Sequence, residues 1–552
     1  MDSSCSTEPV GESRRGYLAE FPPKRSHGVL IALCVAVFYC LGVTNQWWPT
    51  PDSALYQGLG RSLLRGEGYR FNGQVNSDVT PGMPVILAAL RWAFGDGFLA
   101  PNVFVTLSGL ASLFLIYLTF ARLTNRRMAL AVALGTAASY KYFHYSHLIL
   151  TDAPFSALFW ACTYASVRYL QGRRRWLLAA VALAVVAVVV RAPGLLVLGP
   201  MAVGLVLHRN GPAGLPKRLL GGGAILGALG AVAGGLYLLA RSVADTVPLY
   251  ASGALASKGP LLRLQMLLRQ VLAMPDELAR ALTAQPIAPV GAVLCALAVL
   301  GMVDLIRKGS RLSAVTCVLF VVSLGLLGGV RTRYMMAILP LFLFTMLDGV
   351  CWIVEWCHRL RSRPVRPAAF LVAVSASLFL LIAANVPKIV RDSVYYSYAA
   401  YTGQYYRVVR EGHFIDLGPV TRLLRSRFDP GTPVAARTDR VSILHFLSER
   451  RMVRCLGTRR KAAAEADAVY RKLLTRADVQ VIVADVSGEP EPFHRRLDEL
   501  LSASGAPVLY EGAWCKVYDW SGASRSVPPG PRTGPSSRPR GGPAGGAARQ
   551  VE

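Results

Sequence analysis

Long apolar runs are the feature that most limits what this chain can fold into. A helix that crosses a bilayer needs about twenty mostly apolar residues, and such runs recur from residue 28 to residue 386. Of the 552 residues, 53% are hydrophobic. That composition is too apolar for a soluble multi-domain protein, so the sequence predicts a polytopic membrane protein with a mainly α-helical core.

We predict about eleven transmembrane spans, each near the length that a bilayer requires. They are residues 28–46, 98–120, 128–144, 152–170, 176–191, 192–208, 219–240, 287–306, 312–330, 334–356 and 367–386. The apolar run from Val85 to Phe94 is about ten residues long and too short to cross a bilayer, so we expect it to lie in the membrane interface. This run belongs to the first outer loop, residues 47–97.

The positions of Lys and Arg predict the orientation of the spans. The formal net charge is +28, and the basic residues fall mostly in short clusters between apolar runs. Such clusters are typical of loops that set membrane orientation, and they argue against nucleic acid as a partner. They lie in the N-terminal segment 1–27 and around Arg126, Arg174, Lys217, Arg307 and Arg361. If Val85 to Phe94 lies in the interface, all of them share one side, which the positive-inside rule makes cytoplasmic.

The ten cysteines are scattered, and no CxxC or Cys/His spacing typical of a metal site occurs in the sequence. Cys455 and Cys515 share the large polar region, where a disulfide between them is possible but not required. The polar segment before the first apolar run is too long for a cleaved signal peptide, so we expect the first span to remain as an anchor.

Ionisable residues from four loops fall at the outer ends of the spans in this topology. Asp52 follows an aromatic pair in the first outer loop, and Asp152 ends the segment HYSHLILTD. Arg191 lies in VVVRAPGLL, while Arg333 and Tyr334 lie in RTRYMMAILP. Charged residues at membrane depth are costly and are functional candidates by default. We therefore predict a site for an anionic lipid headgroup on the outer face.

Before the last spans, residues 241–286 are predicted to form a longer outer loop with an amphipathic helix. After the last span, the composition changes to that of a soluble domain. Residues 387–520 are predicted to form a small extracytoplasmic α/β domain. Its predicted elements are helices at 417–427, 441–450, 462–475 and 491–503, strands at 433–437 and 479–486, and a hairpin at 508–520. The Pro-, Gly-, Ser- and Arg-rich tail, residues 521–552, is predicted to be disordered.

The order of several short motifs resembles the GT-C superfamily of integral membrane glycosyltransferases. The motifs are PDSALYQGLGRSLLRGEGY, TPGMP, TDAP, RAPGLL and RYMMAILP, and the resemblance covers roughly residues 28–386. The pattern is most similar to the bacterial branch with lipid A aminoarabinose transferase and the protein O-mannosyltransferases, which implies a polyprenyl-phosphate sugar as donor. Relatives often have His-Pro-Pro or Tyr-Pro-Pro where this chain has Thr80 to Pro84. Because of this difference, the identity of the donor and of the acceptor does not carry over from those relatives.

The resemblance implies that Asp52 is the catalytic acid of the first loop, that Asp152 is the second acid, and that Arg333 and Tyr334 are the Arg-Tyr pair of the late loop. The residue types indicate the same chemistry. A carboxylate within reach of an acceptor hydroxyl can act as a base, and arginine binds phosphate through its planar fork. We therefore expect Asp52 to be the base and Arg191 and Arg333 to stabilise the departing phosphate, with inversion at the anomeric carbon.

Each of these residues also has a structural interpretation. Asp52 and Asp152 could cap the helices that follow them, and Arg333 could form a structural ion pair. Tyr334 could anchor the chain at the membrane interface. Three further residues lie near the predicted site and are expected to support it or to lie in the interface: Tyr56, Lys141 and His147.

The sequence therefore predicts an enzyme that moves a sugar from a polyprenyl-phosphate donor to an envelope acceptor, on the outer face of a bacterial plasma membrane. The two acids could also hold Mg²⁺ or Mn²⁺ against a phosphate, although the sequence has no dedicated ligand cluster. Two other classes compete with this interpretation. One is a secondary transporter, for which we find no internal repeat, and the other is a non-catalytic membrane protein that binds envelope glycans.

Overall fold

The computed structural model describes residues 25–191, 260–307, 333–402 and 418–521, with short gaps inside these ranges. The chain forms two compact units, Met1–Asp416 and Leu417–Glu552. The first is helical and the second is α/β. The second unit begins later than the predicted boundary at residue 387, because the helix that precedes it continues to Tyr401.

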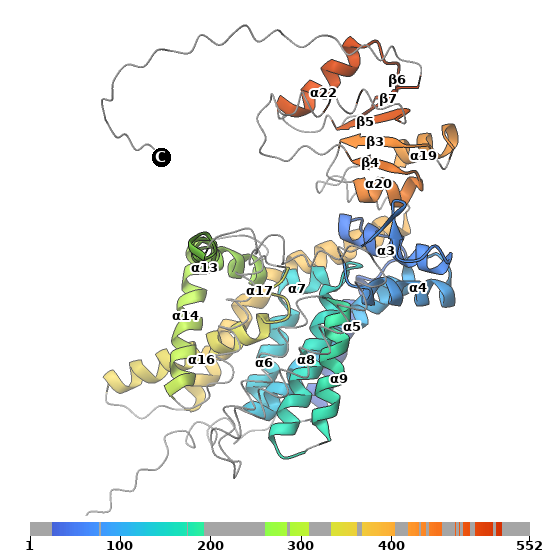
Figure 1. The fold of residues 1–552 in the computed structure, drawn as a ribbon. Helices are drawn as coiled ribbons and strands as arrows, with labels where there is room; N and C mark the ends of the chain where they lie inside the picture. Colours follow the sequence, from blue (N-terminus) through green and yellow to red (C-terminus); the bar gives the residue numbers. More distant parts are fainter. Residues whose placement is uncertain are drawn as a thin grey trace, which may run out of the picture. The chain divides into compact units, whose positions relative to one another are not determined.

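The first unit consists of helices and one small β-hairpin (Figure 1). Its described helices are α2 (Arg25–Leu41), α3 (Pro51–Leu64), α4 (Gly82–Phe94), α5 (Leu99–Leu123), α6 (Arg126–Ala137), α7 (Tyr140–Tyr145), α8 (Asp152–Leu170), α9 (Trp176–Val190), α13 (Pro260–Leu282), α14 (Ala288–Arg307), α16 (Leu339–Leu360) and α17 (Pro367–Tyr401). Strands β1 (Arg70–Phe71) and β2 (Gln74–Val75) pair antiparallel between α3 and α4.

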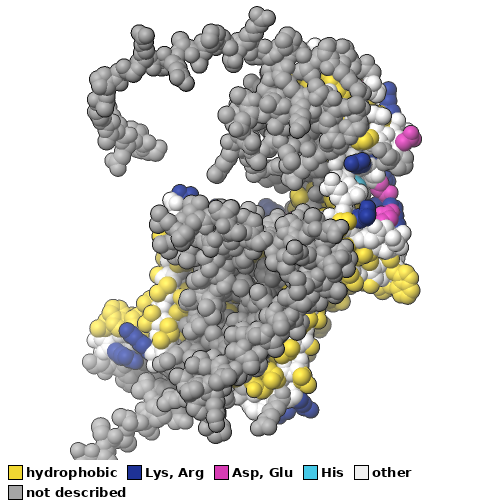
Figure 2. Space-filling model, viewed as in Figure 1, with side chains coloured by type: hydrophobic (Ala, Val, Ile, Leu, Met, Phe, Trp, Pro, Cys, Tyr) yellow, Lys and Arg dark blue, Asp and Glu magenta, His cyan; other side chains and the backbone are white. Residues whose placement is uncertain are grey.

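Four of the described helices are long and apolar enough to cross a bilayer, namely α5, α14, α16 and α17. Helices α2, α4 and α9 are apolar but shorter. The hydrophobic side chains visible in Figure 2 lie along the flanks of the helical unit, and Lys and Arg are visible at both its lower and its upper ends. The protein is a multi-pass membrane protein. The predicted spans 192–208, 219–240 and 312–330 lie outside the described residues.

Residues 128–144 do not form one helix, contrary to the prediction. Helix α6 ends at Ala137, and α7 is a separate helix of six residues. Between them, Ser139 has the non-helical angles φ −70° and ψ 121°, and its hydroxyl donates to the backbone carbonyl of Ala281 in α13. This bond ties the break between α6 and α7 to α13. The apolar pattern alone could not reveal this break, because the bond joins residues far apart in sequence.

Other predicted boundaries differ by part of a helix. Helix α16 begins at Leu339 instead of residue 334, since Pro340 suits the first turn of a helix and residues 333–338 form turns. Helix α17 runs on to Tyr401 instead of ending at 386. The short helix predicted from Val85 to Phe94 is present as α4, which begins three residues earlier, and the amphipathic helix predicted in the loop 241–286 is present as α13.

The core of the helical unit forms where α5, α6, α8 and α16 pack against one another. Phe120 and Trp160 are fully buried there, and their ring centroids lie 5.6 Å apart. The indole of Trp160 donates to the carbonyl oxygen of Ala337 at 2.9 Å, which joins α8 to the turn that precedes α16. That turn carries Arg333 and Tyr334, so the core fixes the place of the late-loop residues.

The second unit contains a five-stranded sheet in the order β4-β3-β5-β7-β6. Its elements are α19 (Gly418–Arg427), β3 (Val434–Arg437), α20 (Val441–Ser448), β4 (Met452–Arg454), β5 (Val481–Asp485), α22 (Pro492–Ala503), β6 (Val508–Glu511) and β7 (Cys515–Asp519). Strand β3 pairs parallel to β4 and β5, whereas β7 pairs antiparallel to β5 and β6. The short strand β4 was not predicted. Cys455, most of the predicted helix 462–475 and the tail after residue 521 lie outside the described residues.

Candidate active site

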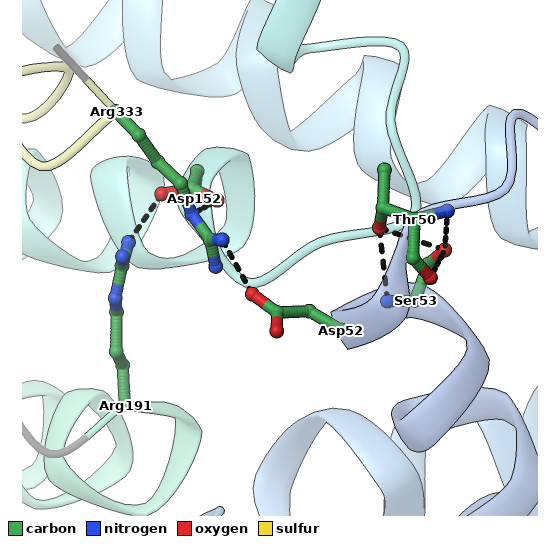
Figure 3. Close-up of polar contacts among 6 residues, drawn as sticks. All are labelled: Thr50, Asp52, Ser53, Asp152, Arg191 and Arg333. Atoms are coloured by element: carbon green, nitrogen blue, oxygen red, sulfur yellow. Dashed lines mark hydrogen bonds and ion pairs between the residues drawn. The ribbon is translucent and has the colours of Figure 1, made fainter. Parts of the chain in front are cut away.

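Two acids and two arginines from four separate segments meet at one end of the helical unit (Figure 3). The carboxylate of Asp152 accepts from Arg191 Nη1 at 2.5 Å through Oδ1 and from Arg333 Nε at 2.9 Å through Oδ2. Arg333 Nη1 donates to Oδ2 of Asp52. Arg333 therefore bridges the two acids, and the predicted convergence of these four residues is confirmed. We call these four residues the acid–arginine cluster.

Helix ends bring the two acids to the cluster. Asp52 is the second residue of α3, which begins with a capping box in which Thr50 and Ser53 exchange side-chain and backbone hydrogen bonds. Asp152 is the first residue of α8, and the side chain of the N-cap residue Thr151 makes no capping hydrogen bond. The helix dipole favours an acid in both first turns. Neither acid is the N-cap residue, so the capping role that the sequence left open falls to Thr50 at α3.

The arginines lie in the turns next to helix ends. Arg191 follows the last residue of α9 and is extended, with φ −156° and ψ 130°. The motif TPGMP holds this end of α9, because the Thr80 hydroxyl donates to the carbonyl oxygen of Val190 at 2.9 Å. A Cβ on Gly82 would lie 2.7 Å from the carbonyl oxygen of Val189, so only glycine allows this close contact. The TPGMP motif thus fixes the backbone from which Arg191 starts.

Burial increases from Asp52 to Asp152 across the cluster. The side chains of Asp52, Arg333, Arg191 and Asp152 are 44%, 23%, 10% and 0% exposed. A fully buried carboxylate is stable only with partners that offset its lost hydration, and Asp152 uses both oxygens in this way. Asp52 can be reached from solvent, and its Oδ1 makes no hydrogen bond within the part of the chain that the structure describes.

Arg191 offers a donor that no described residue uses. Its Nη2 is buried and has no hydrogen-bond partner among the described residues. Its guanidinium lies over the ring of Tyr334 at 4.9 Å and over the ring of Phe155 at 5.6 Å. Tyr334 also lies 5.9 Å below the guanidinium of Arg333, so one ring contacts both cations. A buried cationic N–H without an acceptor indicates a place for an anionic ligand.

The opposite charges of the acid–arginine cluster stabilise one another. Burial opposes the positive charge of Arg333, but the carboxylates of Asp152 and Asp52 outweigh it and raise the pKa of this guanidinium above its ordinary value. Burial raises the pKa of Tyr56, one turn after Asp52 in α3, and the charge of Asp52 raises it further. Tyr56 therefore stays a neutral phenol beside a carboxylate.

The structure does not bring Lys141 and His147 into the cluster. His147 spans α7 and α2, with its two ring nitrogens 2.8 Å from the carbonyl oxygens of Phe143 and Tyr39. Lys141 lies 5.5 Å from the ring centre of Tyr140. Lys141 belongs to the predicted span 128–144 and lies in α7, whereas His147 follows α7.

Two supporting residues were missed in the sequence. Trp47 is 1% exposed and donates from its indole to Ser53 Oγ at 3.0 Å, and it stacks on Phe98 with ring centroids 5.6 Å apart. The amide of Asn102 donates to the carbonyl oxygens of Thr44 and Gln46 at 2.8 and 2.7 Å. These bonds fix the loop that leads into the capping box of α3. For Trp47, the available signal was an aromatic residue three positions before the N-cap Thr50.

The described residues contain no group of three or more His, Cys, Asp or Glu side chains that could hold a metal ion. The two acids, which the sequence left open as ligands of Mg²⁺ or Mn²⁺, have the guanidinium of Arg333 between them.

The helical unit has the fold of the GT-C membrane glycosyltransferases, as the motifs suggested. The protein is similar to two crystal structures of ArnT from Cupriavidus metallidurans. The apo structure is 15% identical, with a TM-score of 0.55 over 90% of this chain and 98% of ArnT. The structure bound to undecaprenyl phosphate is 15% identical, with a TM-score of 0.56 over 91% of this chain and 100% of ArnT.

Sequence comparison covers a smaller part of the chain. Residues 78–237 match the family model described as dolichyl-phosphate-mannose-protein mannosyltransferase. Comparison with curated proteins gives no match. The matched segment includes the TPGMP motif and two of the four residues of the acid–arginine cluster, Asp152 and Arg191.

We expect Asp152→Asn to destabilise the protein more than Asp52→Asn. The amide keeps the volume of Asp152 but leaves Arg191 without a counter-charge and Arg333 with Asp52 alone, and breaking such a buried pair typically costs about 3–5 kcal/mol. Asp52 is far more exposed, so its loss costs less. Thermal unfolding of both variants in detergent measures the difference. Equal melting temperatures for the two variants would show that Asp152 does not organise the cluster.

Proposed function

We propose that the protein transfers a sugar from a polyprenyl-phosphate donor to a hydroxyl group of an envelope acceptor. The observation that carries this proposal is the acid–arginine cluster, in which an accessible carboxylate lies beside guanidinium groups that can bind a phosphate. The fold shared with ArnT and the family model matched by residues 78–237 support it.

Asp52 is the residue best suited to be the base. Its side chain is the most exposed of the cluster, and it is held at the start of a capped helix. In the proposed reaction the acceptor hydroxyl attacks the anomeric carbon, and its proton passes to the Asp52 carboxylate. The bond between the anomeric carbon and the phosphate oxygen breaks at the same time, so the configuration inverts and polyprenyl phosphate leaves with the bonding electrons.

The arginines take the charge that grows on the departing phosphate. Arg191 has a buried Nη2 with no acceptor among the described residues, and Arg333 is held protonated by the two acids. Donors that are fixed in place before the reaction stabilise developing charge most effectively. Asp152 then acts as a positioning residue, since both of its oxygens hold arginines.

The ion pair between Arg333 and Asp52 links donor binding to base activity. While this pair is intact, Arg333 Nη1 donates to Oδ2 of Asp52 and occupies that oxygen. A phosphate that draws Arg333 toward itself weakens the pair and frees the oxygen to accept the proton of the acceptor hydroxyl. We propose that the donor prepares the base in this way.

The location follows from the basic loops and the polar ends of the helices. We propose that the cluster faces the outside of a bacterial plasma membrane, with the N-terminus in the cytoplasm and the α/β unit outside. The α/β unit would then guide the envelope acceptor or regulate its access. A secondary transporter would require charges near the middle of its spans, whereas Asp152, Arg191 and Arg333 lie at helix ends.

We expect Asp52→Asn to abolish transfer while the protein stays folded and inserted. Loss of a general base typically lowers the rate by about 10²–10⁴-fold. The assay uses membranes with the variant, labelled polyprenyl-phosphate sugar and native acceptor. Asp96→Asn is the control, because that side chain is 80% exposed and lies outside the cluster. Activity near wild type in Asp52→Asn would remove the base assignment.

We expect Trp47→Phe to lower kcat and to leave KM for the donor unchanged. The variant keeps the stacked ring but loses the indole N–H that fixes Ser53, and one such hydrogen bond corresponds to a rate change of about two- to tenfold. Trp92→Phe serves as the control, since Trp92 is 82% exposed on α4. A change in KM alone would show that Trp47 acts on donor binding and does not position Asp52.

We propose that Arg333 supplies the positive charge between the acids, so that transfer does not need a divalent cation held jointly by Asp52 and Asp152. Activity should then be unchanged by EDTA and by later addition of Mg²⁺ or Mn²⁺. Loss of activity with EDTA and recovery with either ion would contradict this proposal.

A further inference from the structure

An apolar groove lies between α2, α5 and α6, away from the acid–arginine cluster. Its volume is about 910 Å³, within the range of about 300–1,000 Å³ that ligand pockets occupy. Hydrophobic side chains line most of it, among them Ile31, Val35, Leu113 and Phe114. None of the four residues of the cluster lines the groove.

The basic end of the groove is about one membrane thickness from the cluster. On α5, Asn102 holds the loop that leads to Asp52, while Arg122 lines the groove twenty residues later (122 − 102). Twenty residues of helix extend about 30 Å, which matches the hydrocarbon core of a bilayer. The phosphate of the sugar donor cannot be at both places, so the groove is a separate site.

Two arginines without partners lie at this end. Arg122 and Arg126 both line the groove and are exposed, and neither forms an ion pair or a side-chain hydrogen bond with any residue that the structure describes. Arg126 is the first residue of α6, with Arg127 next to it. Cations in the first turn of a helix are unfavourable, because they lie at the positive end of the helix dipole. A nearby anion would offset this repulsion.

We infer that the groove binds an anionic phospholipid from the leaflet opposite the acid–arginine cluster. Its phosphate contacts Arg122 and Arg126, and an acyl chain lies along the apolar side chains of α2 and α5. Basic pockets between transmembrane helices on the cytoplasmic side bind anionic headgroups in this manner. A zwitterionic lipid fits less well, because its ammonium group would lie close to the same arginines. The lipid fills the space between α2 and its neighbours and so stabilises the position of α2.

The test compares lipids and charge variants in the purified full-length protein. Delipidated protein in detergent receives phosphatidylglycerol or phosphatidylcholine, and native mass spectrometry measures retained lipid while thermal unfolding measures stability. We expect phosphatidylglycerol to be retained and to raise the melting temperature more than phosphatidylcholine does. The affinity of the double variant Arg122→Gln/Arg126→Gln for phosphatidylglycerol should be lower by a factor of at least about ten.

The control is Arg173→Gln/Arg175→Gln, which removes the same charge from exposed positions in the turn between α8 and α9, outside the groove. It should retain the lipid. Equal losses in the two double variants, or equal binding of the two lipids, would show only non-specific charge attraction or ordinary bilayer contact and would overturn the inference.

A second pair of variants tests the apolar part with all charges in place. Ala32 lines the groove, whereas Leu33 is 59% exposed and does not line it. Ala32→Phe should fill the groove and abolish retention of phosphatidylglycerol, while Leu33→Phe should leave it unchanged. Retention in Ala32→Phe at the wild-type level would contradict the proposed acyl-chain position, whatever the arginine variants show.

Discussion

The shared carboxylate of Asp152 is the interaction on which the rest of the site depends. It is fully buried and gives one oxygen to each of two arginines from distant segments. A buried acid without partners would be strongly unfavourable, and two buried arginines without an acid would repel each other. The three side chains therefore hold one another in place. Asp52 joins this group from the solvent side through Arg333, which makes it the member of the cluster best placed to meet a substrate.

The sequence predicted the membership of the cluster more reliably than the helices that carry it. Charged residues at the ends of apolar runs are costly unless they are paired, and this cost was enough to identify Asp52, Asp152, Arg191 and Arg333. The prediction that all four residues lie on one side of the membrane followed from the basic loops and from treating Val85 to Phe94 as an interfacial helix. The cost of an unpaired charge is a property of each residue with its immediate surroundings, so it can be recognised without knowing the fold.

The elements that were mispredicted depend on contacts between distant residues. The break after α6 rests on a hydrogen bond from Ser139 to Ala281, which local periodicity does not record. Lys141 and His147 were placed near the site because of their proximity in sequence, but the break directs His147 toward Tyr39. Strand β4 has only three residues and was missed because it is stable only beside β3. In each case tertiary contacts override the local pattern.

The α8–α9 pair has a consequence for how such sequences can diverge. Asp152 begins one helix and Arg191 follows the end of the next, so their meeting depends on the two helices keeping matched lengths. Deleting one residue from either helix would turn everything beyond it by about 100° and separate the carboxylate from its guanidinium. Apolar side chains on the flanks can replace one another without changing this spacing. The α8–α9 helix pair sets the distance between Asp152 and Arg191. Selection would therefore act on the lengths of these two helices more strictly than on their amino-acid composition.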